Sequence, residues 1–277
     1  MLTTSLDGLW VLQVLAGIEA IAPELGLRPH LPSSETRDMV CGLPIAAELR
    51  RAGVLTAHWD VDEVVREWLT VLAQRDVALL MRVNSPALTG PPRQVLLARF
   101  DRWWVALEKC GEVVRISGMG CARGEQTAAR LISAQLDRFC GRMPPVALRP
   151  VTLDVDEILE QVSDGESLRC YLFRRKLDFE QVNALMQASD RQRSAQASLV
   201  AVQWGVSGAP RRTHIAPGAV TIIDTPEGRL LSEQTVRDGR NWMMLRPGSS
   251  DAIDRAVRKM LRCLPADEEW FSHRKAL

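Results

Sequence analysis

The sequence predicts an α+β fold in which two pseudo-two-fold related halves share one central, largely antiparallel β-sheet. One observation is that the order strand, helices, consecutive strands and closing helix occurs twice, at residues 1–143 and 150–277. Another is that the strands follow one another as meanders instead of alternating strictly with helices, which is typical of α+β folds. Because a shared sheet buries an edge that each half would otherwise expose, we expect one integrated domain.

The first half opens with a short strand and a helical region. The threonine-rich residues 2–6 are typical of a strand, and Asp7 is a suitable N-cap for the apolar helix that follows. In the helical stretch 33–53, Pro44 should kink or divide the helix, and Gly53 suits the position after its end. Residues 60–76 carry apolar side chains at a spacing near 3.6, which predicts a further helix.

Several strands and a closing helix complete the first half. Apolar and β-branched runs predict strands at residues 77–83, 94–100, 103–109 and 112–118. The loop NSPALTGPPR joins the first two strands, and a tight KCGE turn joins the last two. The segment EQTAARLISAQLDRFCG then predicts the closing helix.

The second half repeats this order with low residue identity. Residues 151–155 predict a strand, and Asp156 is the expected N-cap of a helix ending near Gly165. Helices ESLRCYLFRRK and LDFEQVNALMQAS follow. Strands are expected at residues 198–204, 211–216, 219–224 and 228–234, with an extra strand at 241–247 and a closing helix at 249–265.

The composition excludes some classes of function. A formal net charge of +1 does not supply the electrostatic attraction that nucleic acid binding needs, so no nucleic acid partner is expected. The six cysteines are dispersed, and the N-terminus has no basic region of a signal peptide, which favours a cytoplasmic protein. Apolar runs stay shorter than the 18 residues of a membrane span, so none is expected.

Three closely spaced glycines raise the question of a nucleotide site. Gly118, Gly120 and Gly124 are spaced G-x-G-x-x-x-G, one residue off the dinucleotide fingerprint. The corresponding stretch of the second half, MLRPGSSDAIDRAVRKML, joins a strand to a helix without any fingerprint. The first-half strand also ends a meander instead of opening a βαβ unit. We therefore interpret the glycines as a strand-to-helix connector and expect no nucleotide.

Other catalytic or ligand-binding patterns have equally little support. The chain has no phosphate-binding G-x-x-x-x-G-K motif and no G-x-S-x-G elbow, and its four histidines lack metal-ligand spacing. Acidic residues in LDVDEILE are explained by helix capping. We expect no catalysis, no cofactor, no metal and no small-molecule ligand. An enzyme with a dispersed active site stays open as an alternative, because such a site has no sequence signature.

The eight tryptophans are informative about packing. Trp10, Trp68 and Trp204 lie in apolar-periodic stretches and are expected in the core. Trp103 and Trp104 are neighbours in one strand and must face opposite sides of the sheet. We expect Trp104 to be buried, whereas Trp103 either packs under a second layer or forms an exposed apolar surface for a partner. A self-associating structural protein is the remaining alternative, should the extra strand 241–247 lie at a sheet edge.

Several stretches resemble a known family. They are the opening LTTSLDGLWVLQ, the segment ELGLRPHLP with the ETRD-initiated helix ending LRRAGVL, the strand pair AVTIIDTPEGRLLS, and LRPGSSDAIDRAVRKMLRCLPADEEW. Their order over nearly the whole chain resembles the EspG proteins, secretion-associated cytoplasmic chaperones of mycobacterial type VII (ESX) systems. Among the paralogues, the chain looks most like the member of the second ESX system. The break CGLP departs from the continuous helix that we expect in the family.

The resemblance implies a fold, a function and a site. It implies a central sheet flanked by two helical bundles, and binding to the hydrophobic tip of a PPE protein within a PE–PPE heterodimer, which keeps the partner soluble before export. The family meets this partner with the loop between its second and third strands, the sheet surface and the second-half bundle. The candidate partner-binding residues are therefore Ser85, Pro86, Leu88, Pro91, Pro92, Arg93 and Trp103.

Overall fold

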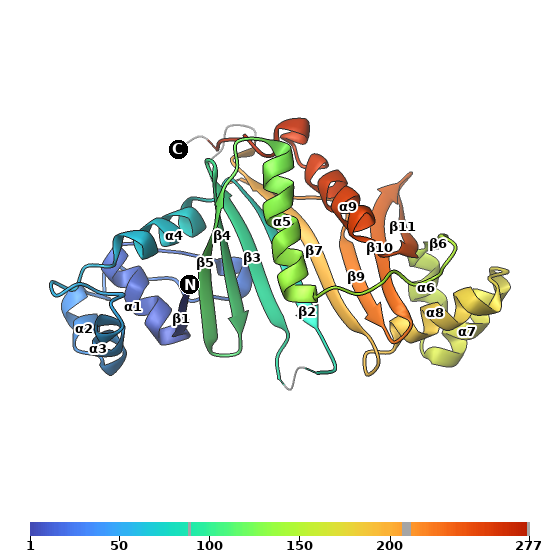
Figure 1. Cartoon of the computed structure of the whole chain (residues 1–277), viewed down its shortest axis with the longest axis horizontal. Coiled ribbons are helices and arrows are strands. Elements are labelled where there is room, and N and C mark those ends of the chain that lie inside the picture. The colour runs from blue at the N-terminus through green and yellow to red at the C-terminus, as the bar shows by residue number, and fades with distance from the viewer. Residues whose placement is uncertain (88–89, 207–211, 276–277) are drawn as a thin grey trace.

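The computed structural model describes residues 1–87, 90–206 and 212–275 of the chain (Figure 1). Within these residues eleven strands form one sheet, and the paired strands are antiparallel. The strands are β1 (Leu2–Ser5), β2 (Val77–Asn84), β3 (Arg93–Phe100), β4 (Trp103–Cys110), β5 (Val113–Cys121), β6 (Val151–Asp154), β7 (Ala195–Trp204), β8 (Thr213–Ile215), β9 (Val220–Thr225), β10 (Gly228–Arg237) and β11 (Arg240–Pro247). Their order is β1-β5-β4-β3-β2-β7-β9-β10-β11-β6, with β8 also paired to β7. The predicted fold class is confirmed.

The two halves meet at the centre of the sheet. β2 and β7 pair along almost their whole length, from Val77 opposite Gln203 to Asn84 opposite Gln196. Each half thereby covers the inner edge of the other, and the strand edge that each would expose alone is removed.

Helices cover both faces of the sheet. At one end lies the first bundle, made of α1 (Leu6–Ala16), α2 (Arg37–Cys41), α3 (Pro44–Arg51) and α4 (Glu63–Gln74), with the 3-10 turn η1 (Pro23–Leu25). At the other end lies the second bundle, α6 (Val155–Gln161), α7 (Gly165–Arg174) and α8 (Phe179–Ser189). The closing helices α5 (Glu125–Cys140) and α9 (Ser250–Arg262) pack on the opposite face, and η3 (Asp267–Glu269) follows α9 (Figure 1). None of the helices in the described ranges is long and apolar enough to cross a membrane.

Side-chain alternation in β2 shows how the two faces are used. Val77, Leu79 and Met81 pack in the core beneath α5 and α9. Ala78 packs instead in the core of the first bundle, on the other face. Because successive side chains of a strand point to opposite faces, the even-numbered positions of β2 lie on the face that carries both bundles. We call this the bundle face.

The helix caps differ from the prediction. Ser5 caps α1, its Oγ accepting from the N–H of Gly8 at 3.1 Å, and Asp154 caps α6 by accepting from the N–H of Asp156 at 3.0 Å. The prediction that Asp7 and Asp156 are the caps is wrong, because each strand passes directly into its helix and its last residue is the cap. Both aspartates lie in the first turn, where a negative charge is still favourable. The second-half helix also ends earlier than expected, at Gln161, and Gly165 begins α7.

The extra strand of the second half is also not the one predicted. β11 pairs with β10 and β6, as β5 pairs with β4 and β1 in the first half. It is therefore the counterpart of β5 and does not lie at an edge. The additional strand is β8, which pairs with the C-terminal part of β7 while β9 pairs with the N-terminal part. Self-association through an edge at residues 241–247 loses its structural basis.

The break in the first-half helical region is confirmed. α2 ends at Cys41, and α3 begins at Pro44, at a first-turn position where the missing N–H of proline has no cost. Gly53 follows α3 with a φ of +74°, which only glycine adopts easily.

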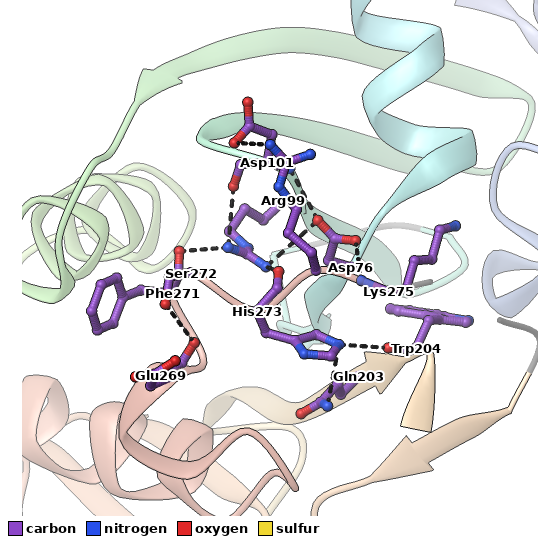
Figure 2. Close-up of polar contacts among 11 residues, drawn as sticks. Asp76, Arg99, Asp101, Gln203, Trp204, Glu269, Phe271, Ser272, His273 and Lys275 are labelled. Atoms are coloured by element: carbon purple, nitrogen blue, oxygen red, sulfur yellow. Dashed lines mark hydrogen bonds and ion pairs between the residues drawn. The ribbon is translucent and has the colours of Figure 1, made fainter. Parts of the chain in front are cut away.

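The C-terminal segment is tied to the end of the central strands (Figure 2). Arg99 of β3 donates to the backbone carbonyls of Phe271 and His273. The backbone N–H of Lys275 donates to Asp76 at 3.0 Å. His273 Nε2 lies 2.9 Å from the carbonyl oxygen of Trp204, which extends the contact to β7. The segment therefore joins the two halves at this end of the sheet.

Candidate protein-binding surface

The centre of the sheet is open on the bundle face. We define the open strip as Leu80, Arg82 and Asn84 of β2 together with Gln196, Ser198 and Val200 of β7. Arg82, Asn84 and Ser198 are exposed, and the other three side chains are half-buried. An antiparallel sheet can leave part of one face to solvent, and here the open part lies on β2 and β7, the innermost strands of the sheet.

The strip is open because the two bundles stop on either side of it. Leu96 of β3 packs in the core of the first bundle, and Ile223 of β9 packs beneath α8 of the second. The start of β2 and the end of β7 are covered as well, since Ala78 and Val202 belong to the first core. Gln196 marks the border with the second bundle, where its Nε2 donates to the carbonyl of Ala188 at 3.0 Å.

The strip combines apolar, neutral polar and positive side chains. Strand register places Arg82 between Gln94 of β3 and Ser198 of β7. Ser198 in turn forms a hydroxyl–hydroxyl hydrogen bond of 3.1 Å with Thr221 of β9. Next to these polar residues, the apolar side chains of Leu80 and Val200 lie directly opposite each other across the β2–β7 pair. The side chain of Arg82 forms no hydrogen bond or ion pair within the described part of the chain.

The loop between β2 and β3 continues directly from the strip. Ser85 turns the chain, with its Oγ accepting from the N–H of Ala87 at 3.3 Å, and Pro86 is exposed. Leu88 lies outside the described residues. The ring of Pro91 lies beside Gly111 in the β4–β5 turn, and Pro92 is half-buried. The loop residues Ser85 and Pro86 are therefore next to Asn84 of the strip.

Arg93 and Trp103 do not join this cluster. The side chain of Arg93 lies on the face opposite the strip, where its Nε is 3.1 Å from Glu108 Oε1 in an ion pair. Trp103 is on the bundle face but pairs with Phe100, at the other end of β3. With a rise of about 3.3 Å per residue, the seven steps from Arg93 to Phe100 separate Trp103 from the loop by roughly 23 Å.

Trp103 borders a separate groove. Its side chain is 48% exposed, whereas that of Trp104 is 1% exposed, which confirms the predicted burial of Trp104. The groove has a volume of about 630 Å³ and is lined by Trp103, Phe100 and residues of α4 that include Trp68. Of the tryptophans predicted in the core, Trp204 is buried, while Trp10 and Trp68 are partly buried against the first core.

The second bundle carries large apolar side chains that face solvent. Leu159 of α6 is 76% exposed and Phe179 of α8 is 77% exposed. Phe173 of α7 is 48% exposed. Exposed apolar residues of this size in neighbouring helices are typical of a protein-binding surface. The sheet strip and this bundle are the two parts of the bundle face that resemble such a surface.

Among the described residues no three His, Cys, Asp or Glu side chains are grouped as metal ligands. The strip itself has neither a carboxylate nor a thiol, so its chemistry is that of contact and hydrogen bonding.

The sequence did not predict which residues form the open strip. Its only sequence signal is the alternation of polar residues at one end of two apolar strands, in the runs MRVN and AQAS. Such alternation predicts a solvent-facing side of a strand. It does not show that two such strands lie next to each other.

Comparisons with known proteins agree on one family. The model of the EspG family matches residues 5–259. The chain is 43% identical over the full length of both proteins to the ESX-2 secretion-associated protein EspG2 of Mycobacterium tuberculosis, in agreement with the resemblance to the second ESX system. It is 26% identical to the ESX-5 secretion-associated protein EspG5 of Mycobacterium marinum, over 98% of this chain and 96% of that one.

A solved structure has the same fold. It is that of the Mycobacterium tuberculosis type VII secretion system chaperone EspG5 in complex with a PE25–PPE41 dimer. The TM-score is 0.77 at 22% sequence identity, and the match covers 98% of this chain and 99% of that chain.

Proposed function

The chain belongs to the EspG family, and we propose that it is a cytoplasmic, substrate-specific chaperone of a type VII secretion system. In this role it binds the hydrophobic tip of a PPE protein within a PE–PPE heterodimer. The structurally similar EspG5 is described in complex with a PE25–PPE41 dimer, which supports the same class of partner for this chain.

The observation that carries the proposal is the open strip at the centre of the sheet. Both bundles stop short of the innermost strands, which leaves an open sheet surface with helices on either side. A helical tip placed on the strip would contact Leu80 and Val200 and would lie beside the β2–β3 loop. Covering the apolar tip lowers the population of free, aggregation-prone partner by mass action.

We propose that the β2–β3 loop contacts the bound tip. Its prolines restrict the free loop, so less conformational entropy is lost when the loop is ordered on a partner. Ser85, Pro86, Leu88, Pro91 and Pro92 are the proposed contacts. We leave Arg93 and Trp103 out of this surface, because one is paired on the opposite face and the other lies at the far end of the strands.

We also propose that the protein acts by binding alone, as one unit of two halves, residues 1–143 and 150–277. The relatives are named as secretion-associated proteins. The open strip, which lies wholly within the described residues, has neither a carboxylate nor a thiol. No cofactor, nucleic acid or small-molecule ligand is needed for this function.

Co-expression tests the proposal. The chain is produced with PE–PPE pairs encoded in the same genome, and the mixtures are separated by size exclusion. We expect a stable complex of all three chains with at least one pair. Elution of the chain alone in the presence of every pair would overturn the proposed function.

A loop variant tests the proposed contact. Leu88→Asp should weaken the complex by about 1–3 kcal/mol, the range for loss of an interface anchor. The matched control is Leu31→Asp. Leu31 belongs to the first half, is 54% exposed and lies outside the proposed surface. Equal affinities of the two variants, measured by calorimetry, would exclude the loop from the interface.

A further inference from the structure

Arg82 is the single charged residue of the open strip. Its side chain is exposed and forms no hydrogen bond or ion pair within the described ranges. Two other arginines of the sheet are paired within the chain. Arg229 pairs with Asp224 at 2.6 Å, and Arg93 pairs with Glu108 at 3.1 Å. An arginine at the middle of a binding surface is therefore left free for an external group.

The neighbours of Arg82 cannot neutralise it. Its cross-strand neighbours are Gln94 and Ser198, which are uncharged. Ser198 is already hydrogen-bonded to Thr221. The apolar pair Leu80 and Val200 lies on the same face, two residues away along each strand. A partner that covers the strip would take the guanidinium out of water without any compensating group from this chain.

Burying an unpaired charge is costly, so the partner must supply its own negative group. A carboxylate is the best fit, because a guanidinium presents parallel N–H donors that match its two oxygens. The apolar residues beside Arg82 would exclude water from the pair and increase the cost of a mismatch. A partner without the acid would leave Arg82 buried and unpaired.

We propose that Arg82 selects the cognate partner by pairing with an Asp or Glu side chain in the segment that covers the open strip. This inference rests on the proposed function and adds a specific recognition chemistry to it. A partner's acid is then accepted at this position, while a neutral or basic residue is rejected. Specificity of this kind comes from a penalty against wrong partners as much as from attraction to the right one.

The experiment uses the full chain and the PE–PPE pair that forms a complex with the unmodified protein. Arg82→Glu should weaken binding by about 100-fold or more, because like charges then meet in the interface. Arg82→Met, which keeps the aliphatic length and removes the charge, should weaken binding less and should reduce the salt dependence of the affinity. Arg51→Glu is the control, since Arg51 is exposed on α3, away from the strip.

Charge reversal in the partner identifies the acid. Each Asp and Glu of the PPE tip is replaced in turn by Lys, and each variant is titrated with the Arg82→Glu protein. We expect one of these substitutions to restore binding to the Arg82→Glu protein and to weaken binding to the unmodified protein. Circular dichroism and thermal melting establish that both Arg82 variants are folded, as expected for an exposed side chain.

The possible results separate the two proposals. Unchanged binding by Arg82→Glu would overturn this inference alone, because the complex itself would still form. Weakened binding that no acid-to-lysine substitution restores would also overturn it, and would indicate backbone carbonyls of the partner as the group beside Arg82. Absence of a complex between the unmodified protein and any PE–PPE pair would overturn the proposed function and this inference together.

Discussion

Asp76 and Arg99 form a fully buried ion pair at one end of the central strands, with 3.6 Å between Asp76 Oδ2 and Arg99 Nη2 (Figure 2). The backbone connects the same residues, since the N–H of Asp76 donates to the carbonyl of Arg99 at 2.7 Å. Burial lowers the pKa of Arg99 to about 10, which still leaves it charged at neutral pH. The pair holds the C-terminal segment, because Asp76 accepts from Lys275 and Arg99 donates to Phe271 and His273.

The first prediction concerns this pair. Asp76→Asn should lower the free energy of unfolding by about 3–5 kcal/mol, because it leaves the guanidinium of Arg99 charged and buried without its counter-ion. Urea denaturation measures the change. The control is Asp60→Asn, which breaks the ion pair with Arg37 at 3.0 Å between side chains that are 52% and 47% exposed. This control should change the free energy by less than about 1 kcal/mol, and equal losses for both variants would contradict the prediction.

The second prediction concerns Trp270. Its side chain is fully buried, meets Trp104 edge-to-face with 6.4 Å between ring centroids, and donates from Nε1 to Glu125 at 3.3 Å. Trp270→Ala should lower the free energy of unfolding by about 3–5 kcal/mol through lost burial and the cavity left behind. Trp103→Ala is the matched control, because Trp103 is 48% exposed. A similar loss for both substitutions in urea denaturation would show that Trp270 is not a core anchor.

The third prediction concerns the glycine-rich end of β5. A Cβ atom on Gly118 would lie 2.9 Å from Nε1 of Trp68, so Gly118→Ala must displace this ring. We expect a change in tryptophan fluorescence and a loss of about 1–3 kcal/mol in the free energy of unfolding, as for overpacking. Gly124→Ala adds the same methyl group where, apart from its chain neighbours, no atom of the described residues lies within 4 Å, and it should change both quantities much less. Indistinguishable spectra of the two variants would contradict the prediction.

Much of the fold could be predicted because the signals are local. Apolar periodicity located α4, α8 and the strands of both meanders, and Pro44 located the division between α2 and α3. The repetition of the order of elements was enough to predict that the two halves share a sheet. The two N-caps were predicted two residues too late. Serine or aspartate at the end of a strand and aspartate in the first turn of a helix both fit an N-cap, so the sequence does not distinguish them.

Features that depend on pairing between distant strands could not be predicted in the same way. Local sequence patterns predicted both β8 and β11 as strands, and only their partners show that β8 is the additional strand. The candidate loop followed from a family resemblance and its proline content. The open strip depends on where two helical bundles stop, which no local pattern of β2 or β7 encodes. Arg82 therefore became informative only when Gln94 and Ser198 were found beside it.

The final prediction concerns pH and the buried carboxylate of Glu35. A hydrogen bond from the backbone N–H of Leu31 at 2.8 Å, with further donation by Arg28 and by Trp10 at 3.0 Å, lowers the pKa of Glu35 from 4.5 to about 2. A carboxyl group with a depressed pKa in the folded state stabilises the fold above its unfolded value. This contribution is complete above pH 4.5 and is lost as the pH falls towards 2. Glu35→Gln should therefore reduce the loss of stability between these two pH values.

Urea denaturation midpoints of the unmodified protein and of Glu35→Gln at neutral pH and near pH 3 measure this effect. At neutral pH the variant should be less stable, because a neutral amide cannot accept from all three donors as strongly as a carboxylate. Near pH 3 the difference between the two proteins should be smaller, since the unfolded chain, whose Glu35 has a pKa near 4.5, binds a proton there while folded Glu35, with a pKa of about 2, stays mostly ionised. Glu48→Gln, at an exposed position of α3, controls for the loss of a negative charge. A difference between unmodified protein and Glu35→Gln that stays constant with pH would show that the Glu35 carboxylate is not the titrating group.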